Sequence, residues 1–178
     1  MSGHSKWSKV KHQKATTDVV KSAAFTKATH AIMIAAREGG GARLRLAIER
    51  AREVNMPKEN IERAVARAVG QGTVGIEQMT YEGYGPGGVA ILIHAATDNR
   101  QRAVSQIKNV LERAGGTLVS PGALNYLFER RGTSIEPKQE MGLTLNEEQK
   151  HKVDVLIEDL EELDDVQTVF TNLAQEGI

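Results

Sequence analysis

The sequence predicts an α+β protein in which an N-terminal three-helix domain precedes an antiparallel sheet with helices on one of its faces. Two observations lead to this fold class. Apolar residues recur at helical spacing up to Val69. From Gln78 onward, short apolar or alternating runs typical of strands are interleaved with two further helical patterns. The chain has 178 residues, enough for two small domains, and we expect these to comprise residues 1–72 and 76–178.

The three N-terminal helices follow from apolar spacing and from the placement of glycine and proline. We expect them over residues 18–38, 44–55 and 57–69. The glycines at 39–41 end the first, because glycine readily adopts the left-handed conformation found at helix C-termini. Pro57 suits the first position of the third helix, where its missing N–H costs no hydrogen bond.

The second domain begins with strands at about residues 79–81 and 89–93, the latter a continuous apolar run that suits a central strand. Leu124, Tyr126 and Phe128 alternate with other residues and predict a half-buried strand. Residues 132–145 are expected to be mostly loop, with a short strand left open at 133–135. The other expected elements are a helix that begins at Asp98 or Asn99 and ends before Gly115, a last helix at 147–163 and a closing strand at 166–170.

The segment from Gly83 to Gly88 matches the pattern G-x-G-x-x-G. A dinucleotide site needs this loop to open a helix, whose N-terminus then faces the pyrophosphate. Here a predicted strand follows instead, and Pro86 removes one of the N–H groups that a phosphate would use. We therefore interpret the segment as a hairpin turn.

No catalytic or metal-binding constellation is recognisable. The chain has no cysteine, which excludes disulfide scaffolds, thiolate zinc sites and cysteine nucleophiles. The five histidines lack metal-ligand spacing, and the acidic stretch at 158–165 fits a solvated helix face. We expect no catalytic residues, metal or other cofactor. No apolar run approaches the roughly 20 residues that span a bilayer, and the N-terminus lacks a signal peptide, so we expect a cytoplasmic protein without a membrane partner.

Charge is strongly segregated although the net charge is zero. Residues 1–70 contain 14 Lys and Arg against 6 Asp and Glu, whereas residues 133–178 contain 3 against 12. Asp18 is the only acidic residue in the first 30 positions, and the only tryptophan, Trp7, lies among lysines there. Lysines release counterions when they bind phosphates, and an indole can stack on a base. Trp7 has the alternative role of packing on the helices. The predicted nucleic-acid-binding residues are Lys6, Trp7, Lys9, Lys11, His12, Lys14, Lys21 and Lys27. The smaller basic groups at Arg100, Arg102, Arg130 and Arg131 are interpreted as ordinary surface.

Several segments resemble the YebC/PmpR family in order along nearly the whole chain. They include Gly3-His4-Ser5-Lys6-Trp7, Asn55-Met56-Pro57-Lys58-Glu59-Asn60-Ile61, Tyr81-Glu82-Gly83-Tyr84-Gly85-Pro86-Gly87-Gly88-Val89, Thr97-Asp98-Asn99-Arg100 and Leu163-Asp164-Asp165-Val166-Gln167. The resemblance implies a helical N-terminal domain followed by ferredoxin-like α/β domains. Family members are usually about 60 residues longer, so the family's third domain is expected to be absent around residues 132–145.

The resemblance also implies a cytoplasmic DNA-binding transcriptional regulator. Mitochondrial relatives are described as translational activators, and bacterial relatives have been linked to translation through stalling-prone nascent chains. Three functions therefore remain open: a non-enzymatic transcriptional regulator, a translation factor that binds ribosomal RNA, and an enzyme with an unrecognised site near Tyr84 and Gly85. The sequence leaves the oligomeric state undetermined.

Overall fold

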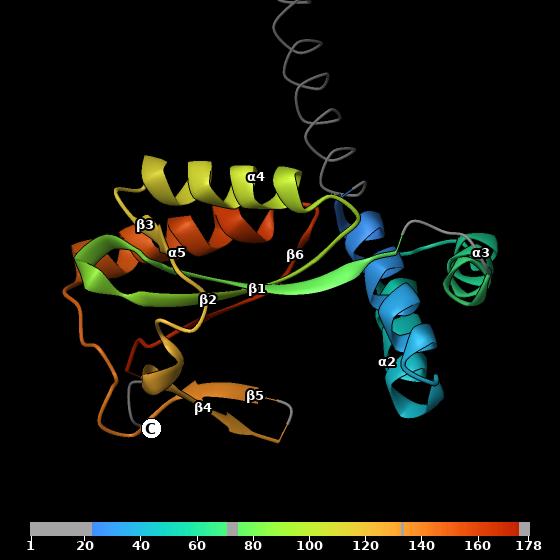
Figure 1. The fold of residues 1–178 in the computed structure, drawn as a ribbon, viewed down its shortest axis with the longest axis horizontal. Coiled ribbons are helices and arrows are strands. Elements are labelled where there is room, and N and C mark those ends of the chain that lie inside the picture. The colour runs from blue at the N-terminus through green and yellow to red at the C-terminus, as the bar shows by residue number, and fades with distance from the viewer. Residues whose placement is uncertain (1–22, 71–74, 133, 175–178) are drawn as a thin grey trace, which may run out of the picture. The chain divides into compact units, whose positions relative to one another are not determined.

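A computed structural model describes residues 23–70, 75–132 and 134–174. The chain divides into two compact units, Met1–Val74 and Gly75–Ile178, and each is considered by itself (Figure 1). Among the described residues, no helix has the length and apolar character needed to cross a membrane.

The first unit is helical. It contains a helix over residues 23–37, α2 (Gly41–Glu53) and α3 (Lys58–Val69). The second helix begins earlier than expected, because the positive φ angles of Gly39 (99°) and Gly40 (73°) already reverse the chain. The small core is rich in alanine, as the sequence predicts, and its most buried side chains are Ile32, Ala51 and Ala64.

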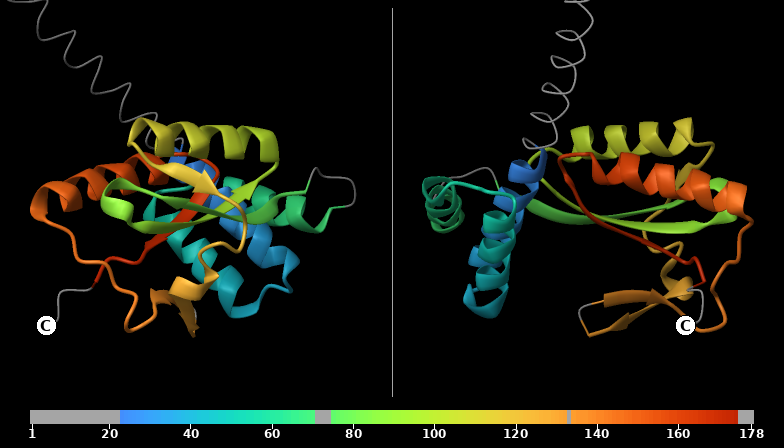
Figure 2. Two further views of the ribbon diagram at one scale, coloured as in Figure 1. Left: turned by 60° about the vertical axis from the view of Figure 1, so that its left-hand side comes forward. Right: turned by 180° about the vertical axis from the view of Figure 1, so that it is seen from behind.

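The second unit holds a four-stranded antiparallel sheet, two helices and a separate hairpin (Figure 2). Its first half comprises β1 (Glu77–Tyr84), β2 (Ala90–Thr97), α4 (Arg100–Arg113) and β3 (Thr117–Val119). Its second half comprises β4 (Phe128–Arg131), β5 (Ser134–Pro137), α5 (Glu147–Glu161) and β6 (Val166–Thr171).

The strand order β3-β1-β2-β6 identifies the ferredoxin-like arrangement. Because β2 and β3 both pair antiparallel with β1, they run parallel to each other with β1 between them. In the same way, β1 and β6 run parallel on either side of β2. The crossover through α4 therefore forms a split β-α-β unit. The predicted α+β class and ferredoxin-like sandwich are confirmed.

Both helices of this unit cover one face of the sheet, and the β4–β5 hairpin lies on the other (Figure 1). Under the helices, Ile91 and Ile93 pack with Ile107 of α4 and Leu156 of α5, all of them fully or almost fully buried. On the opposite face, a smaller cluster consists of Ala90, Leu92, Leu124, Leu127 and Phe128.

Two expectations for the middle of the chain were wrong. The predicted strand at 124–129 is a short 3₁₀ turn, Asn125–Leu127, followed by β4. Leu124, Leu127 and Phe128 are buried, whereas Tyr126 is 57% exposed, so the apolar spacing reflects a turn rather than strand alternation. The strand β3 was not predicted, because three residues at a sheet edge carry too short a pattern.

The Gly83–Gly88 segment is a hairpin connection, as predicted. It joins β1 to β2, which pair antiparallel from Tyr84 opposite Ala90 to Glu77 opposite Thr97. A Cβ atom on Gly85 would lie 2.9 Å from side-chain carbons of both Ile91 and Leu156. Gly87 has a φ of 68°, and a Cβ there would lie 2.7 Å from Leu145. These glycines are needed for close packing, which accounts for the motif without a ligand.

Candidate nucleic-acid interface

Most of the predicted binding residues lie in residues 1–17, which we call the N-terminal arm. Lys27 is half-buried on the helix over residues 23–37 and already has an interaction partner. The other predicted residues fall outside the described part of the chain, and their role stays a prediction: Lys6, Trp7, Lys9, Lys11, His12, Lys14 and Lys21.

Exposed arginines on α2 extend the basic character beyond the arm. Ala47 and Ala51 of α2 face the core. Arg45 and Arg52 are seven residues apart, so they lie on the same side of the helix. Both are exposed, and neither has an ion-pair or hydrogen-bond partner among the described residues. Arg43, by contrast, pairs with Glu38 at 2.5 Å and is partly neutralised.

A groove of about 160 Å³ lies in the same unit. Phe25 and Thr29 line it from the helix over residues 23–37, and Asn60, Arg63 and Arg67 line it from α3. Asn60, Arg63 and Arg67 are spaced by three and four residues, so they share one flank of the helix. Such a groove presents guanidinium donors beside an amide and an aromatic ring.

The electrostatic balance of this unit favours anions. Residues 23–70 contain nine Lys and Arg against five Asp and Glu, a net charge of +4. Guanidinium groups bind phosphates through paired N–H donors and remain charged at all physiological pH values. The described part of the unit therefore carries an excess of positive charge.

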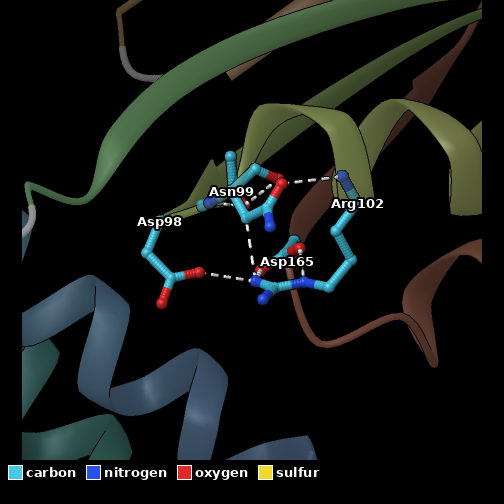
Figure 3. A network of polar contacts seen from close by, with 5 residues as sticks. Asp98, Asn99, Arg102 and Asp165 are labelled. Atoms are coloured by element: carbon cyan, nitrogen blue, oxygen red, sulfur yellow. Dashed lines mark hydrogen bonds and ion pairs between the residues drawn. The ribbon is translucent and has the colours of Figure 1, made fainter.

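Arg102 of the second unit serves a structural purpose that the sequence did not reveal (Figure 3). Its Nε and Nη2 atoms donate to the two carboxylate oxygens of Asp165 at 3.0 and 2.8 Å. Nη2 also donates to Asp98 at 2.7 Å. The hydrogen bonds to Asp165, then that to Asp98, raise the pKa of Arg102. Asn99 caps α4 by accepting the backbone N–H of Arg102 at 3.0 Å.

This network joins two of the motifs quoted above, the segment Thr97–Arg100 and the segment Leu163–Gln167. The side chain of Asp165 is 2% exposed, so it depends on Arg102 for neutralisation. Arg100 is likewise occupied, in an ion pair with Glu77. Arg102 therefore stabilises the fold by neutralising a buried carboxylate, whereas Arg100 is paired at the surface.

A second buried carboxylate organises the loop before β4. Glu82 is 4% exposed, and it accepts hydrogen bonds from the backbone N–H groups of Gly122 at 2.6 Å and Leu124 at 2.7 Å. Both carboxylate oxygens are thereby used. Glu82 belongs to the family segment Tyr81–Val89. Its contacts show that this segment anchors the loop before β4 against the sheet.

A metal site is not evident in the described residues, where no three His, Cys, Asp or Glu side chains are grouped to hold an ion. In the segment around Tyr84 and Gly85, the glycine is in close contact with Ile91 and Leu156, and Tyr84 packs against the apolar cluster.

Comparisons with known proteins agree along the chain. Residues 5–71 match the model of the "TACO1/YebC protein N-terminal domain", and residues 76–142 match that of the "TACO1/YebC second and third domain". A "probable transcriptional regulatory protein" of Pseudothermotoga lettingae is 43% identical over 97% of this chain and 70% of its own length. One with the same name from Dictyoglomus turgidum is 48% identical over 78% of this chain, which spans 58% of that relative.

A solved structure shows the same fold. The crystal structure of a conserved hypothetical protein from Aquifex aeolicus superposes with a TM-score of 0.76 at 30% identity, covering 88% of this chain and 92% of that one. Both curated relatives are longer than this chain, since 97% of it corresponds to only 70% of the first. With both family models matched in order over most of its length, the chain belongs to the TACO1/YebC family.

Proposed function

We propose that this protein is a non-enzymatic regulator of transcription that binds duplex DNA in the cytoplasm. The names of its relatives support a regulatory role, since those relatives are called probable transcriptional regulatory proteins. The proposal assigns phosphate contacts to the N-terminal unit, through the arm lysines, α2 and α3. The ferredoxin-like unit would then contribute contacts of another kind.

The observation that carries this proposal is the set of exposed, unpaired arginines on the first unit. Arg45 and Arg52 share one side of α2, and Arg63 lies in the groove beside α3. Within the described residues these side chains have no carboxylate to neutralise them. Each guanidinium kept in water is available to displace a counterion from a phosphate, which is the main source of sequence-independent affinity.

The experiment measures binding of the full chain to duplex DNA across a salt series. Each phosphate contact should contribute about 0.9 to the slope of log K against log salt on duplex DNA, or about 0.7 on single strands. Arg45→Ala with Arg52→Ala should therefore lower the duplex slope by about 1.8, and Arg63→Ala by about 0.9. Arg113→Ala is the matched control, because Arg113 is exposed and has no ion-pair partner in the described part of the chain, but lies on α4 of the other unit.

The arm is tested in the same assay. Single changes of Lys6, Lys9, Lys11 or Lys14 to Ala should each weaken binding to all sequences and lower the slope by about one. Trp7→Ala should cost roughly 1–3 kcal/mol with little change in slope if the indole stacks on a base. If Trp7 instead packs on the helices, the melting temperature should fall.

Two outcomes would redirect the proposal. Wild-type slopes in all arginine and lysine variants would remove the basis for a DNA interface on the first unit. Co-sedimentation with ribosomes, together with arginine-dependent binding to ribosomal RNA rather than to duplex DNA, would favour a translation factor. The proposed absence of the family's third domain bears on both functions, and appending that domain from a longer relative would show whether it changes affinity.

A further inference from the structure

On the sheet face opposite the helices, an apolar cluster covers one part, and the side chains of Gln78, Thr80 and Thr168 are exposed in another. The cluster around Leu124 and Phe128 covers the part of this face that holds Ala90 and Leu92. In the other part the strand register places Thr80 beside His94 on the neighbouring strand, and Thr168 beside His94 from the other side. We call the exposed positions together with two neighbouring rings the open sheet face, which comprises Gln78, Thr80, His94, Thr168 and Phe170. Phe170 lies opposite Leu92 and also packs against the apolar cluster.

Two rings form the centre of the open sheet face. His94 of β2 and Phe170 of β6 have ring centroids 5.1 Å apart and an interplanar angle of 70°, an edge-to-face contact. Both side chains are half-buried, so part of each ring remains accessible. Burial, and secondarily the charge of Arg130, lowers the pKa of His94. The imidazole is therefore neutral at pH 7 and offers an uncharged π surface.

Arg130 supplies a positive charge on the hairpin that packs on this side of the sheet. In the β4–β5 hairpin it lies opposite Ile135, and Ile135 packs against the apolar cluster on the sheet. Because directly opposed residues share a face, Arg130 is on the hairpin face turned toward the sheet. It is exposed and has no ion-pair partner among the described residues, whereas its neighbour Arg131 pairs with Glu129 and Glu136.

Negative charge is excluded from this side of the sheet. By register, the positions of β1, β2 and β6 that face away from the helices include a single acidic residue, Glu82. Its carboxylate is buried and bonded to two backbone N–H groups. The exposed polar groups are the uncharged side chains of Gln78, Thr80 and Thr168. Rings, a free guanidinium and neutral polar groups are the combination that recognises a nucleotide.

We propose that the open sheet face binds one unpaired nucleotide of a single-stranded nucleic acid, with the base against His94 and Phe170 and the phosphate near Arg130. This inference rests on the proposed nucleic-acid function and adds a contact that a closed duplex cannot make, since its bases are stacked inside. Thr80 and Thr168 would hydrogen-bond the edge of the base. RNA and DNA single strands share this chemistry.

The test uses the full chain and labelled oligonucleotides of about 10 nucleotides, within the usual site size of about 4–16. The probes are single-stranded RNA, single-stranded DNA and a closed duplex. Arg130→Ala removes the phosphate contact, and Thr80→Glu places a repelling charge on the open sheet face. The matched controls are Arg131→Ala, which changes a paired arginine of the same hairpin, and Gln106→Glu, which adds the same charge to an exposed position on α4.

We expect Arg130→Ala to lower the salt slope on single strands by about 0.7, with no change on the duplex. Loss of base stacking in His94→Ala should weaken single-strand binding by about 5- to 150-fold. Phe170→Leu keeps the apolar packing and removes the ring, so it should reproduce this loss without unfolding the protein. Stronger binding of RNA than of DNA would indicate a contact to the 2′-hydroxyl group.

The outcomes separate this inference from the proposed function. Wild-type single-strand affinity in Arg130→Ala, Thr80→Glu and Phe170→Leu, while the α2 arginine variants lose binding, would overturn the open sheet face and leave the first unit as the interface. Equal losses on single strands and duplex would also overturn it, because an unpaired base would then not be needed. A wild-type chain that binds none of the probes would contradict both proposals.

Discussion

Arg102 and Asp165 are 63 positions apart in the chain and meet in a two-point contact, with N···O distances of 3.0 and 2.8 Å. Arg102 lies in the first turn of α4, and Asp165 lies immediately before β6. The pair therefore fixes the start of one helix to the segment that follows the other. Because Asp165 is buried and Arg102 is partly exposed, the two ends of the contact are not equivalent.

This asymmetry predicts unequal costs of mutation. Arg102→Ala should lower the free energy of unfolding by about 3–5 kcal/mol, because it leaves a buried carboxylate unpaired. Asp98→Ala should cost less than about 1 kcal/mol, since Asp98 is an exposed partner of the same arginine. Urea denaturation monitored by circular dichroism would measure both. Similar small effects for the two variants would show that Asp165 is neutralised in another way.

Glu82 gives a second prediction about buried charge. Glu82→Gln should lower the free energy of unfolding by about 1.5–3 kcal/mol, because an amide cannot accept from both Gly122 and Leu124. Hydrogen exchange at these two amides should become faster. Glu129→Gln is the control, since Glu129 pairs with Arg131 near the surface and should change stability little. Unchanged protection of Gly122 would contradict the anchoring role.

Gly115 and Gly116 follow α4, and alanine substitutions at these two positions compare the cost of backbone strain with the cost of steric overlap. A Cβ on Gly116 would overlap the carbonyl oxygen of Tyr84, so Gly116→Ala should cost at least about 3 kcal/mol. Gly115 has a φ of 78° but open space around it, so Gly115→Ala should cost only about 1–2 kcal/mol. Melting temperatures of the two variants provide the comparison. The reverse order would mean that the chain relaxes easily at Gly116.

His94 predicts a pH dependence. Its pKa is lowered from 6.5 by burial and then by Arg130, so the folded state disfavours protonation more than the unfolded state does. The unfolded chain therefore binds more protons just below pH 6.5, and stability must fall as the pH decreases through that range. His94→Gln should remove this step. Parallel denaturation curves of the two proteins at pH 7 and 5.5 test it, and an equal loss in both would assign the dependence elsewhere.

The division of the chain, still a proposal, predicts which fragments fold. Residues 76–178 should unfold cooperatively, because they contain the whole sheet and both helices. Residues 76–131 should not unfold cooperatively, because they lack α5. Burial of Val153, Leu156 and Leu160 of α5 contributes roughly 1.5–3 kcal/mol per side chain to the free energy of unfolding. Calorimetry distinguishes the two fragments. A cooperative transition in the shorter one would show that β1, β2, β3 and α4 form a stable unit without α5.

The sequence identifies the elements that have long, regular patterns. The run at 89–93 predicts the central strand β2. Of the two residues considered for the start of α4, Asn99 is the one whose side chain caps the helix. Short elements were missed because three residues, as in β3, do not establish a period. The alternation around Tyr126 was misread because the burial of Leu127 depends on a cluster formed across the sheet.

For the candidate sites, the sequence predicts where charge gathers but not which partner each charged residue contacts. The segregation of charge along the chain and the arm lysines predict an anion-binding end without any structure. The assignment of Arg102 to a buried partner required the chain to be folded, because nothing local links it to Asp165. The neighbours of Arg130 are likewise set by hairpin register and by the packing of Ile135, neither of which is visible in the order of residues.

The pairing of β2 with β6 has a consequence for biosynthesis. β2 ends at Thr97, but the strand that covers its outer edge begins only at Val166. While the intervening residues are being translated, the nascent chain can form the β1–β2 hairpin and the split β-α-β unit, yet one edge of β2 stays unpaired. An uncovered edge of apolar sequence invites association with other chains. Slow translation between these strands should therefore promote aggregation, and rapid arrival of β6 should protect the newly made protein.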